Sequence, residues 1–315
     1  MEFVELRAHT AFSFGDGAVT PEALAARAAE LDYPAIGLTD AADFGGIPRF
    51  VLEAERRGVK PIVGAELEVD GHPMAFLVET AEGYCNLAAL VTRARVGELA
   101  GWDREHPRTR RGRASLTRSQ VAERSAGLIA LTGPPSGKLG TYLLAGRRED
   151  AARALAEWRE VFGDRLAVEV QFHRAGSHET ALVDGLIELA ERERVPWVVC
   201  RNPRYLDNTS RLVHDMLTAL RAERTLDEAA HAGVLLPSGH WRLPRREEMA
   251  REWARRPEGL AASAAIADRC RFELEWMRPP LPHFPVPEEH SDISWLRVCV
   301  EAGARERWGE IRAEH

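Results

Sequence analysis

The sequence predicts an α/β fold over its first two thirds and a mostly helical segment after it. Short apolar runs typical of strands alternate with longer stretches in which apolar residues recur at helical spacing. Regular alternation of this kind favours a mostly parallel sheet with helices between the strands. From about Leu206 the strand signals fade and helical patterns dominate. The alternation alone does not distinguish a parallel barrel from a doubly wound sheet.

Seven apolar runs are predicted to be strands. They cover residues 3–6, 35–38, 61–69, 74–78, 127–132, 166–172 and 197–200. Helices are predicted between them and after them, at about 21–31, 47–57, 82–96, 138–145, 149–161, 179–194, 211–222, 246–253, 259–269 and 293–308. Thr20 is a suitable N-cap, with Pro21 in the first turn, and Gly58 is a suitable C-cap for the second helix. The proline-rich residues 277–287 fit neither a helix nor an inner strand.

Composition limits the classes of protein that this chain can represent. Its 315 residues are 45% hydrophobic, which is enough for one large domain or one domain with an appendage. A formal charge of −7 argues against a general nucleic-acid coat. The four cysteines show no C-x-x-C spacing, which argues against a zinc ribbon or disulfide framework and favours a reducing cytoplasm. No long apolar run and no signal-peptide pattern are present, so we expect a cytoplasmic protein with no membrane contact.

Polar residues suited to metal binding lie at the ends of several predicted strands. His9 and Asp40 follow the first and second strands, Glu66 lies in the third, and Asn202 follows the seventh. Functional residues of a parallel barrel sit at the C-terminal ends of its strands, so these four residues predict a site at a barrel mouth. Taken alone, His9 is also typical of a hydrogen-bonded core histidine, which is the structural alternative. Cys200, His173 and His214 lack partners at catalytic or metal-ligand spacing and are predicted to pack in the interior.

Five stretches together resemble a known family. They are FVELRAHTAFSFGDGA (3–18), IGLTDAADFGG (36–46), PIVGAELEV (61–69), WRLPRREEMAREW (241–253) and LPHFPVP (281–287). The series resembles the polymerase-and-histidinol-phosphatase (PHP) domain at the N-terminus of bacterial C-family DNA polymerases, the polymerase III alpha-subunit type, and especially their error-prone branch. The resemblance implies a distorted (β/α)7 barrel over residues 1–222 and a helical, proline-rich connector toward the polymerase palm over residues 223–315. It also implies that the sequence stops before the polymerase active site would begin.

The resemblance implies a metal site in which most ligands have been replaced. An active PHP site holds two or three divalent metals with about nine His, Asp, Glu or Cys ligands. The family pattern retains His9, Asp16 and Glu66, with His72 and Asn202 as weak candidates. The positions that depart from it are Arg7, Ala41, Pro73, Pro134 and Arg204. We therefore expect no cofactor here, with Zn²⁺ or Mn²⁺ as a less favoured alternative, and Mg²⁺ only at the polymerase site of the parent enzyme.

Two of the replacements suggest what takes the place of the metal charge. Carboxylates left unpaired in a cavity are costly, and Arg7 and Arg204 stand at positions where ligands were lost. The hypothesis is that Arg7 and Arg204 form ion pairs with Asp16 and Glu66. The alternative for Asp16, which lies between two glycines, is an ordinary turn residue.

A basic segment at about residues 104–118 is the one compositionally biased stretch. Its arginines include Arg108, Arg110, Arg111 and Arg113. They are typical of a solvated surface loop, and they also suit contact with a template strand or a partner protein. Both interpretations remain open at the level of sequence.

The resemblance implies a function at the level of the parent enzyme. That enzyme would be an error-prone DNA-directed DNA polymerase, a nucleotidyltransferase used in translesion synthesis and damage-induced mutagenesis. This part of it would be a non-catalytic scaffold and docking module for the other polymerase domains, with mutagenesis accessory proteins as candidate partners and DNA bound through the parent enzyme. The alternative is a metal-dependent 3′–5′ exonuclease or phosphoesterase that works with a reduced ligand set.

Overall fold

The computed structural model describes residues 3–96, 115–278 and 284–309. Contacts within the chain divide it into two compact units, Met1–Trp276 and Met277–His315. The first unit contains the sheet and is an α/β fold, as the sequence predicts. The arginines of the basic segment, Arg108, Arg110, Arg111 and Arg113, lie outside the described residues.

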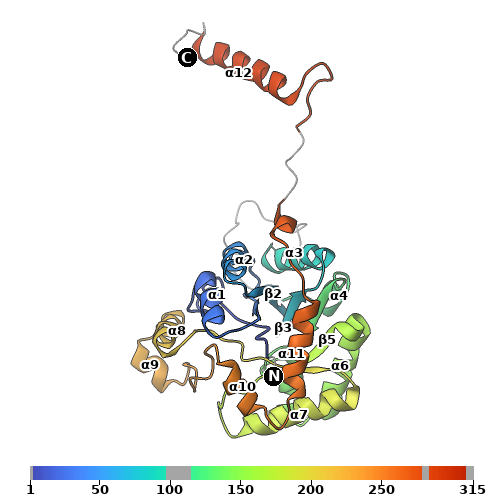
Figure 1. Ribbon diagram of the computed structural model, residues 1–315, viewed down its shortest axis with the longest axis vertical. Helices are drawn as coiled ribbons and strands as arrows, with labels where there is room; N and C mark the ends of the chain where they lie inside the picture. Colours follow the sequence, from blue (N-terminus) through green and yellow to red (C-terminus); the bar gives the residue numbers. More distant parts are fainter. Residues whose placement is uncertain (1–2, 97–114, 279–283, 310–315) are drawn as a thin grey trace. The chain divides into compact units, whose positions relative to one another are not determined.

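A six-stranded sheet forms the centre of the first unit and curls into a half-barrel (Figure 1). Its strands lie side by side in sequence order: β1 (Ala35–Leu38), β2 (Lys60–Val69), β3 (His72–Val78), β4 (Leu128–Leu131), β5 (Leu166–Val170) and β6 (Trp197–Val199). Most residues of these strands are buried, and the partly buried ones lie in β2 and at the start of β3. This burial explains why they read in the sequence as continuous apolar runs and not as alternating patterns.

The sheet is mostly parallel, as the sequence predicts, except at β3. β1–β2, β4–β5 and β5–β6 are parallel, whereas β3 runs antiparallel to both of its neighbours. The cause is a two-residue hairpin between β2 and β3, in which Asp70 and Gly71 both have positive φ, of 49° and 78°. Such a turn joins antiparallel strands only.

The first predicted strand is also reduced in the structure. Residues 3–6 touch β1 through a single parallel bridge between Glu5 and Ile36, with the Gly37 amide donating to the Glu5 carbonyl at 2.7 Å. A Cβ atom at Gly37 would lie 2.0 Å from the Leu6 carbonyl oxygen. Glycine therefore permits the close approach that places the N-terminal segment against β1.

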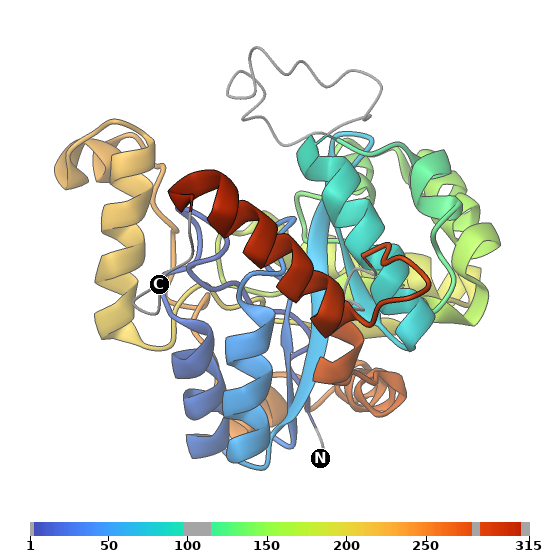
Figure 2. The same ribbon diagram turned by 90° about the horizontal axis from the view of Figure 1, so that it is seen from above.

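Helices pack around the sheet, with α1 (Pro21–Glu30) and α2 (Ile47–Arg56) side by side (Figure 2). Thr20 caps α1 as predicted, its side chain accepting from the Ala23 amide at 3.2 Å. The other helices of the first unit are α3 (Ala81–Val96), α4 (Arg118–Ala122), α5 (Lys138–Leu144), α6 (Arg148–Phe162), α7 (His178–Glu193), α8 (Asn208–Arg221), α9 (Leu226–His231), α10 (Arg246–Glu252) and α11 (Glu258–Arg269). The second unit contains α12 (Asp292–Trp308). Among the described residues, no helix is both long enough and apolar enough to cross a bilayer.

Two short helices, α4 and α9, are absent from the sequence-based prediction. Each begins with a capping box, Thr117 with Gln120 and Thr225 with Glu228. The S/T-x-x-E/Q pattern that produces a capping box is visible in the sequence. These helices were missed because they span only five and six residues, too few to show a helical period.

The core extends past the predicted domain boundary at residue 222. Ile266, Ala267 and Cys270 at the C-terminal end of α11 share a buried cluster with residues of the strands. Gly259 at the start of α11 lies directly against the Trp197 ring, where an added Cβ would lie 2.1 Å from the ring. Residues 223–276 therefore lie in the first compact unit. The division into a PHP domain and a connector at residue 222 stays a prediction.

Candidate functional site

Residues at the family's metal positions come from three parts of the fold. Arg7 and His9 follow the bridge at Glu5, Glu66 lies in β2, and Arg204 follows β6. A short parallel bridge between Ala41 and Glu66 ties the end of β1 to β2 at the same place. The structure brings Arg7, His9, Asp16, Glu66 and Arg204 together in one cluster of charged groups.

Arg7 is the centre of this cluster and has no solvent-exposed surface. Its Nη1 donates to both oxygens of Glu169, at 2.9 and 2.7 Å, and its Nη2 donates to Glu66. Burial acts to lower the pKa of Arg7, but Glu169 and Glu66 outweigh it and raise that pKa above its ordinary value. The guanidinium is thus a permanent positive charge between two carboxylates.

Asp16 and His9 form the outer half of the cluster. His9 Nδ1 lies 2.8 Å from Asp16 Oδ2, and Arg204 Nη1 approaches the same oxygen at 3.0 Å. Burial acts to raise the pKa of Asp16, but Arg204 and His9 outweigh it and hold that pKa well below its usual range. Asp16 therefore stays ionised and is shared between two basic groups.

Glu66 connects the two halves. Its Oε2 accepts from Arg7 and lies 3.5 Å from His9 Nε2. Burial acts to raise the pKa of Glu66, but His9 and Arg7 outweigh it and hold the pKa well below its usual range. Only small fractions of the Glu66 and Asp16 side chains, 12% and 22%, reach solvent.

Asp40, at the end of β1, has its oxygens occupied by the neighbouring loop. It accepts from the Thr10 amide at 2.7 Å, from the Thr10 hydroxyl at 2.6 Å and from the Ser13 hydroxyl at 2.5 Å. The Ser13 hydroxyl in turn accepts from the Ala41 amide at 3.0 Å. Asp40 thus shapes the turn that carries Asp16 toward His9.

The sequence did not single out two buried glutamates that complete the site. Glu169 in β5 is the main partner of Arg7, and Glu5 accepts from the backbone amides of Arg7, Arg201 and Asn202 at 3.3, 2.8 and 3.4 Å. Burial raises the pKa of Glu5 to about 8. A usable signal was present, because each glutamate is the only acidic residue in an otherwise apolar strand segment.

Other predicted positions do not join the cluster. His72 is the first residue of β3 and pairs with Val69, which lies three residues after Glu66 in β2. Pro73 pairs with Glu68. Asn202 is buried with a left-handed φ of 49°, and its Oδ1 has no hydrogen-bond partner in the described structure. Pro134 follows Gly133, where an added Cβ would lie 2.0 Å from the Pro73 carbonyl oxygen. In the described ranges, no three His, Cys, Asp or Glu side chains are arranged to hold a metal ion.

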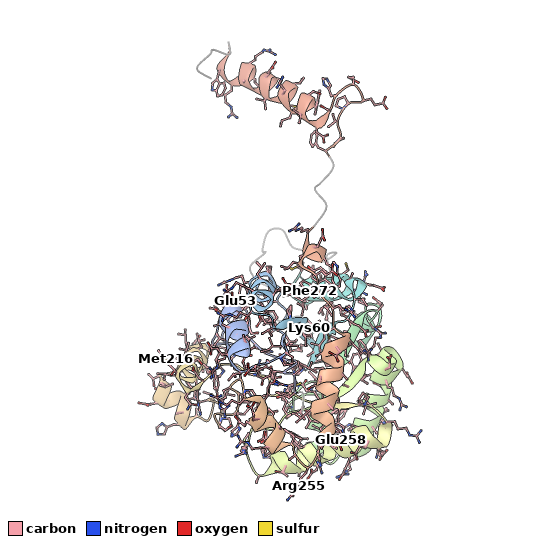
Figure 3. The ribbon with its side chains drawn as sticks, viewed as in Figure 1. Glu53, Lys60, Met216, Arg255, Glu258 and Phe272 are labelled. Atoms are coloured by element: carbon pink, nitrogen blue, oxygen red, sulfur yellow. The ribbon has the colours of Figure 1, made fainter. Side chains whose placement is uncertain are left out.

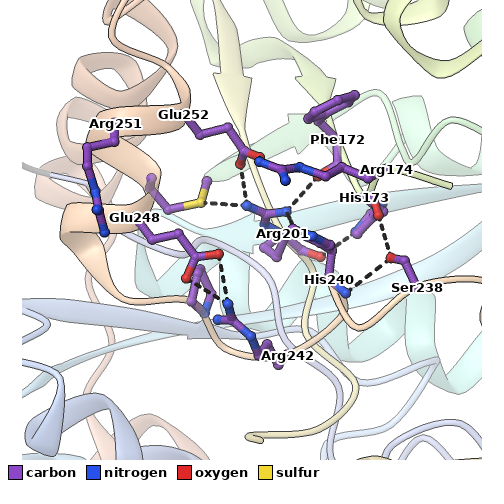
Figure 4. A network of polar contacts seen from close by, with 12 residues as sticks. Phe172, His173, Arg174, Arg201, Ser238, His240, Arg242, Glu248, Arg251 and Glu252 are labelled. Carbon is purple, nitrogen blue, oxygen red and sulfur yellow. Dashed lines mark hydrogen bonds and ion pairs between the residues drawn. The ribbon is translucent and has the colours of Figure 1, made fainter. Parts of the chain in front are cut away.

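A second buried network lies beside the cluster, at the end of β6 (Figure 4). The Arg201 guanidinium donates to the Phe172 carbonyl at 2.7 Å, contacts His240 Nδ1 at 2.9 Å and pairs with Glu252 of α10. It also approaches the Met249 sulfur at 3.2 Å. Arg201 therefore fastens α10 and the segment before it to the carboxyl ends of β5 and β6.

His173 and His214 are buried, as the sequence predicts for packing residues. The His173 ring stacks on Trp241 with centroids 4.0 Å apart, and its Nε2 lies 2.8 Å from the Arg201 carbonyl oxygen. Burial lowers the pKa of His173 to about 3, so its ring is neutral. His214 is buried on α8, and burial lowers its pKa as well. The Cys200 thiol is buried, and burial raises its pKa well above the ordinary value.

Comparison with known protein families matches residues 5–173, more than half of the chain, to the PHP domain. The chain belongs to the PHP domain family. The matched residues contain Arg7, His9, Asp16, Glu66 and Glu169, so most of the charged cluster lies inside the PHP match. Arg204 and Asn202 lie beyond its end.

Relatives of this PHP domain chain are named as polymerases. The chain is 36% identical over 298 residues to an error-prone DNA polymerase of Anaeromyxobacter dehalogenans, and the match covers 93% of this chain and 25% of that protein. It is 32% identical over 314 residues to the DNA polymerase III subunit alpha of Pseudomonas aeruginosa, covering 98% and 26%. The chain thus spans about a quarter of the length of these relatives. A solved amidohydrolase structure from Chromobacterium violaceum aligns with a TM-score of 0.42 at 18% identity, over 64% of this chain and 87% of its own.

Proposed function

We propose that this chain is the N-terminal PHP domain of an error-prone DNA polymerase and acts as a non-catalytic scaffold within it. The relatives named as error-prone polymerases, which match almost the whole chain, support this assignment. The parent enzyme would transfer nucleotides during translesion synthesis with Mg²⁺ bound elsewhere. The PHP domain would stabilise the polymerase domains and offer a docking surface to mutagenesis accessory proteins in the cytoplasm.

The position of Arg7 is the observation that carries the non-catalytic role. Its guanidinium bonds to Glu66 and Glu169, both carboxylates suited to a divalent metal. A guanidinium offers no lone pair to a metal and remains protonated, so it repels a divalent ion at the same place. The residues present therefore do not fit a two- or three-metal cluster. Without that cluster, the domain lacks the metal-activated water that hydrolyses a phosphoester in such sites.

The arginines supply positive charge that the metals would otherwise supply. Arg7 compensates Glu66 and Glu169, while Arg204 compensates Asp16. Buried carboxylates without such partners would destabilise the fold. The replacement would keep the barrel mouth closed and rigid after the catalytic chemistry was lost.

One observation favours the second candidate, a metal-dependent 3′–5′ exonuclease or phosphoesterase with a reduced ligand set. The contact of His9 Nδ1 with Asp16 resembles the way carboxylates orient metal-binding histidines. His9 Nε2 is then buried with no hydrogen-bond partner among the described atoms, 3.5 Å from Glu66 Oε2. A single weakly held ion between these two atoms is the remaining route to catalysis.

Metal content and hydrolysis distinguish the two candidates. The chain would be purified without chelator, equilibrated with Zn²⁺ or Mn²⁺, desalted, and analysed by mass spectrometry, with His9→Ala as the matched control. We expect less than about 0.2 metal equivalents in both proteins and no shortening of a 5′-labelled oligonucleotide, since so few ligands hold an ion weakly. The second candidate would be established instead by one or more metal equivalents in the unmodified chain that His9→Ala lacks, together with Mn²⁺-dependent shortening of the oligonucleotide.

A separate experiment tests the role of this domain within the polymerase. In the longer polymerase chain, Arg7→Ala should lower the thermal midpoint and the yield of primer extension together. The rate of extension per folded molecule should stay unchanged, because a scaffold residue does not touch the nucleotide. A lower rate at unchanged stability would contradict the scaffold role.

A further inference from the structure

Residues 236–242 form a strap between α9 and α10 that lies against the segments following β5 and β6 (Figure 4). Its backbone is irregular, and an isolated bridge joins Arg242 to Tyr205. The Arg204 amide donates to the Trp241 carbonyl at 2.8 Å. Irregular backbone with few hydrogen bonds opens at a lower free energy than the buried strands beneath it.

His240 in the strap accepts a hydrogen bond from Arg201, and this contact fixes the protonation state of its ring. Arg201 Nη1 lies 2.9 Å from His240 Nδ1. A guanidinium carries donors only, so Nδ1 of the imidazole must offer its lone pair. The strap in this position therefore requires a neutral His240 ring.

The surroundings of His240 are unfavourable for a proton. The charged groups that face it are Arg201 after β6, Arg174 after β5, Arg242 in the strap, and Glu248 and Glu252 in α10. Partial burial lowers the pKa of His240 below its ordinary value of 6.5, and the three arginines lower it further. The two glutamates oppose this effect, but each is paired with an arginine already. A proton on His240 would therefore remove the hydrogen bond from Arg201 and add a fourth cation.

We propose that the strap is a pH-sensitive cover, closed while His240 is neutral and opened when His240 takes up a proton. The strap is the part that moves, because Arg201 is fixed. Its side chain is almost completely buried, donates to the Phe172 carbonyl at 2.7 Å and pairs with Glu252. These contacts do not involve the strap and remain when His240 is protonated.

The elements that follow the strap are anchored independently of His240. α10 is held through Glu252, and Gly259 at the start of α11 lies against the Trp197 ring. Near the other end of α11, Lys60 Nζ donates to the Ala267 carbonyl at 2.6 Å, and Figure 3 shows Lys60 beside this helix. Opening is therefore confined to the strap.

Opening of the strap reaches the charged cluster through Arg204. It takes the Trp241 carbonyl away from the Arg204 amide, and the side chain of the same residue pairs with Asp16 at 3.0 Å. The strap thus couples the protonation of His240 to the outer half of the cluster. This proposal does not depend on the polymerase assignment.

A second histidine beneath the strap adds to the effect. The Trp241 ring covers His173 at a centroid distance of 4.0 Å, and burial lowers the pKa of His173 to about 3. Arg201, Arg204 and His240 lower that pKa as well, while the Glu179 carboxylate lies 3.8 Å from Nδ1. Both histidines are neutral under the closed strap, and both bind protons more readily once it opens. Opening should therefore increase as the pH falls below about 6.5 and stay constant above it.

Amide exchange at Arg204 measures strap opening, because the Arg204 amide is bonded to the Trp241 carbonyl. Its protection, relative to an unstructured peptide at the same pH, should fall between about pH 7 and about pH 5. In His240→Asn the side-chain oxygen can accept from Arg201 without titrating, so its protection should fall less. The two declines should differ by at least about threefold and at most about 25-fold, the limit for one group with an unfolded pKa of 6.5.

Two controls separate strap opening from other effects. His231→Asn changes an exposed histidine on α9 and should leave the decline at Arg204 as in the unmodified chain. The Val168 amide, which donates to the Pro196 carbonyl at 2.8 Å in the sheet, reports unfolding of the whole domain and shows that each variant is folded. It should be better protected than the Arg204 amide at both pH values.

A difference below about threefold between the unmodified chain and His240→Asn would overturn the proposal. So would an equal change in His231→Asn. Protection of the Arg204 amide as strong as that of Val168 would also overturn it, because the strap would then open only when the whole domain unfolds.

Discussion

Arg7 makes two ion pairs in the interior of the domain, with Glu66 and with Glu169. Both of its partners are carboxylates that would face each other across the curled sheet without it. A buried charge gains little from its partner once the cost of removing both from water is counted, but a buried charge left alone is strongly destabilising. The effect of Arg7 on stability should therefore appear when Arg7 alone is removed.

Arg7→Met should lower the free energy of unfolding by about 3–5 kcal/mol, because Glu66 and Glu169 would remain buried without their cation. Urea unfolding at neutral pH measures the change. Arg49→Ala removes an exposed pair with Glu22 and should cost no more than about 1 kcal/mol. Restoring part of the loss by adding Glu169→Gln would support charge compensation, and a loss under about 1 kcal/mol for Arg7→Met would contradict it.

The buried carboxyl group of Glu5 should make the stability of the fold depend on pH. Its folded pKa is raised to about 8 from an unfolded value of 4.5, so the folded protein keeps a proton that the unfolded chain releases between these values. The free energy of unfolding should fall as pH rises from about 5 to about 8, by at most about 1.4 kcal/mol per pH unit from this group. Glu5→Gln, which cannot ionise, should flatten the slope, whereas exposed Glu55→Gln should not. Equal slopes in both variants would show that Glu5 is not the group responsible.

At the scale of elements, the attachment of α10 depends on one buried side chain. Arg201 reaches from the end of β6 to Glu252 and Met249 on α10, while Ser238 and His240 fix the segment before the helix. α10 has only seven residues, too few for a stable isolated helix. Its order therefore comes from these tertiary contacts.

Glu252→Gln should loosen α10 by leaving the Arg201 guanidinium buried without a carboxylate. Amide exchange in α10 should speed up, and the free energy of unfolding should fall by about 3–5 kcal/mol. Asp184→Asn is the control, because Asp184 pairs with Arg256 at a side-chain exposure near one half. If α10 exchanges at the same rate in both variants, Arg201 does not hold it in place.

At the scale of the whole molecule, α11 belongs to the barrel that the sequence separates from it. The contact of Gly259 with Trp197 and the apolar residues at the end of α11 extend the core across β6. Large buried areas of this kind supply most of the stability of a domain. The compact unit should accordingly end near Trp276 and not at residue 222.

Two shortened chains test this boundary. A chain that ends at Trp276 should unfold cooperatively with the midpoint of the full chain, since the first unit keeps all of its own contacts. A chain that ends at Ala222 should lose cooperative unfolding, because the β6 side of the core would be exposed to water. Calorimetry measures both. Cooperative unfolding of the shorter chain would support the predicted boundary at residue 222.

The sequence by itself determined the α/β class, the positions of most helices and strands, and the residue types at the family's metal positions. These features depend on local periodicity, on capping residues such as Thr20, and on side-chain chemistry, all of which are readable within a few neighbouring residues. Tertiary structure alone decided the place of α11 and the role of Glu169. Arg7 and Glu169 are 162 residues apart in the chain, and only the closing of the sheet brings them together. Local propensity carries no information about such a pairing, because the energy of that pairing depends on which groups share the same buried space.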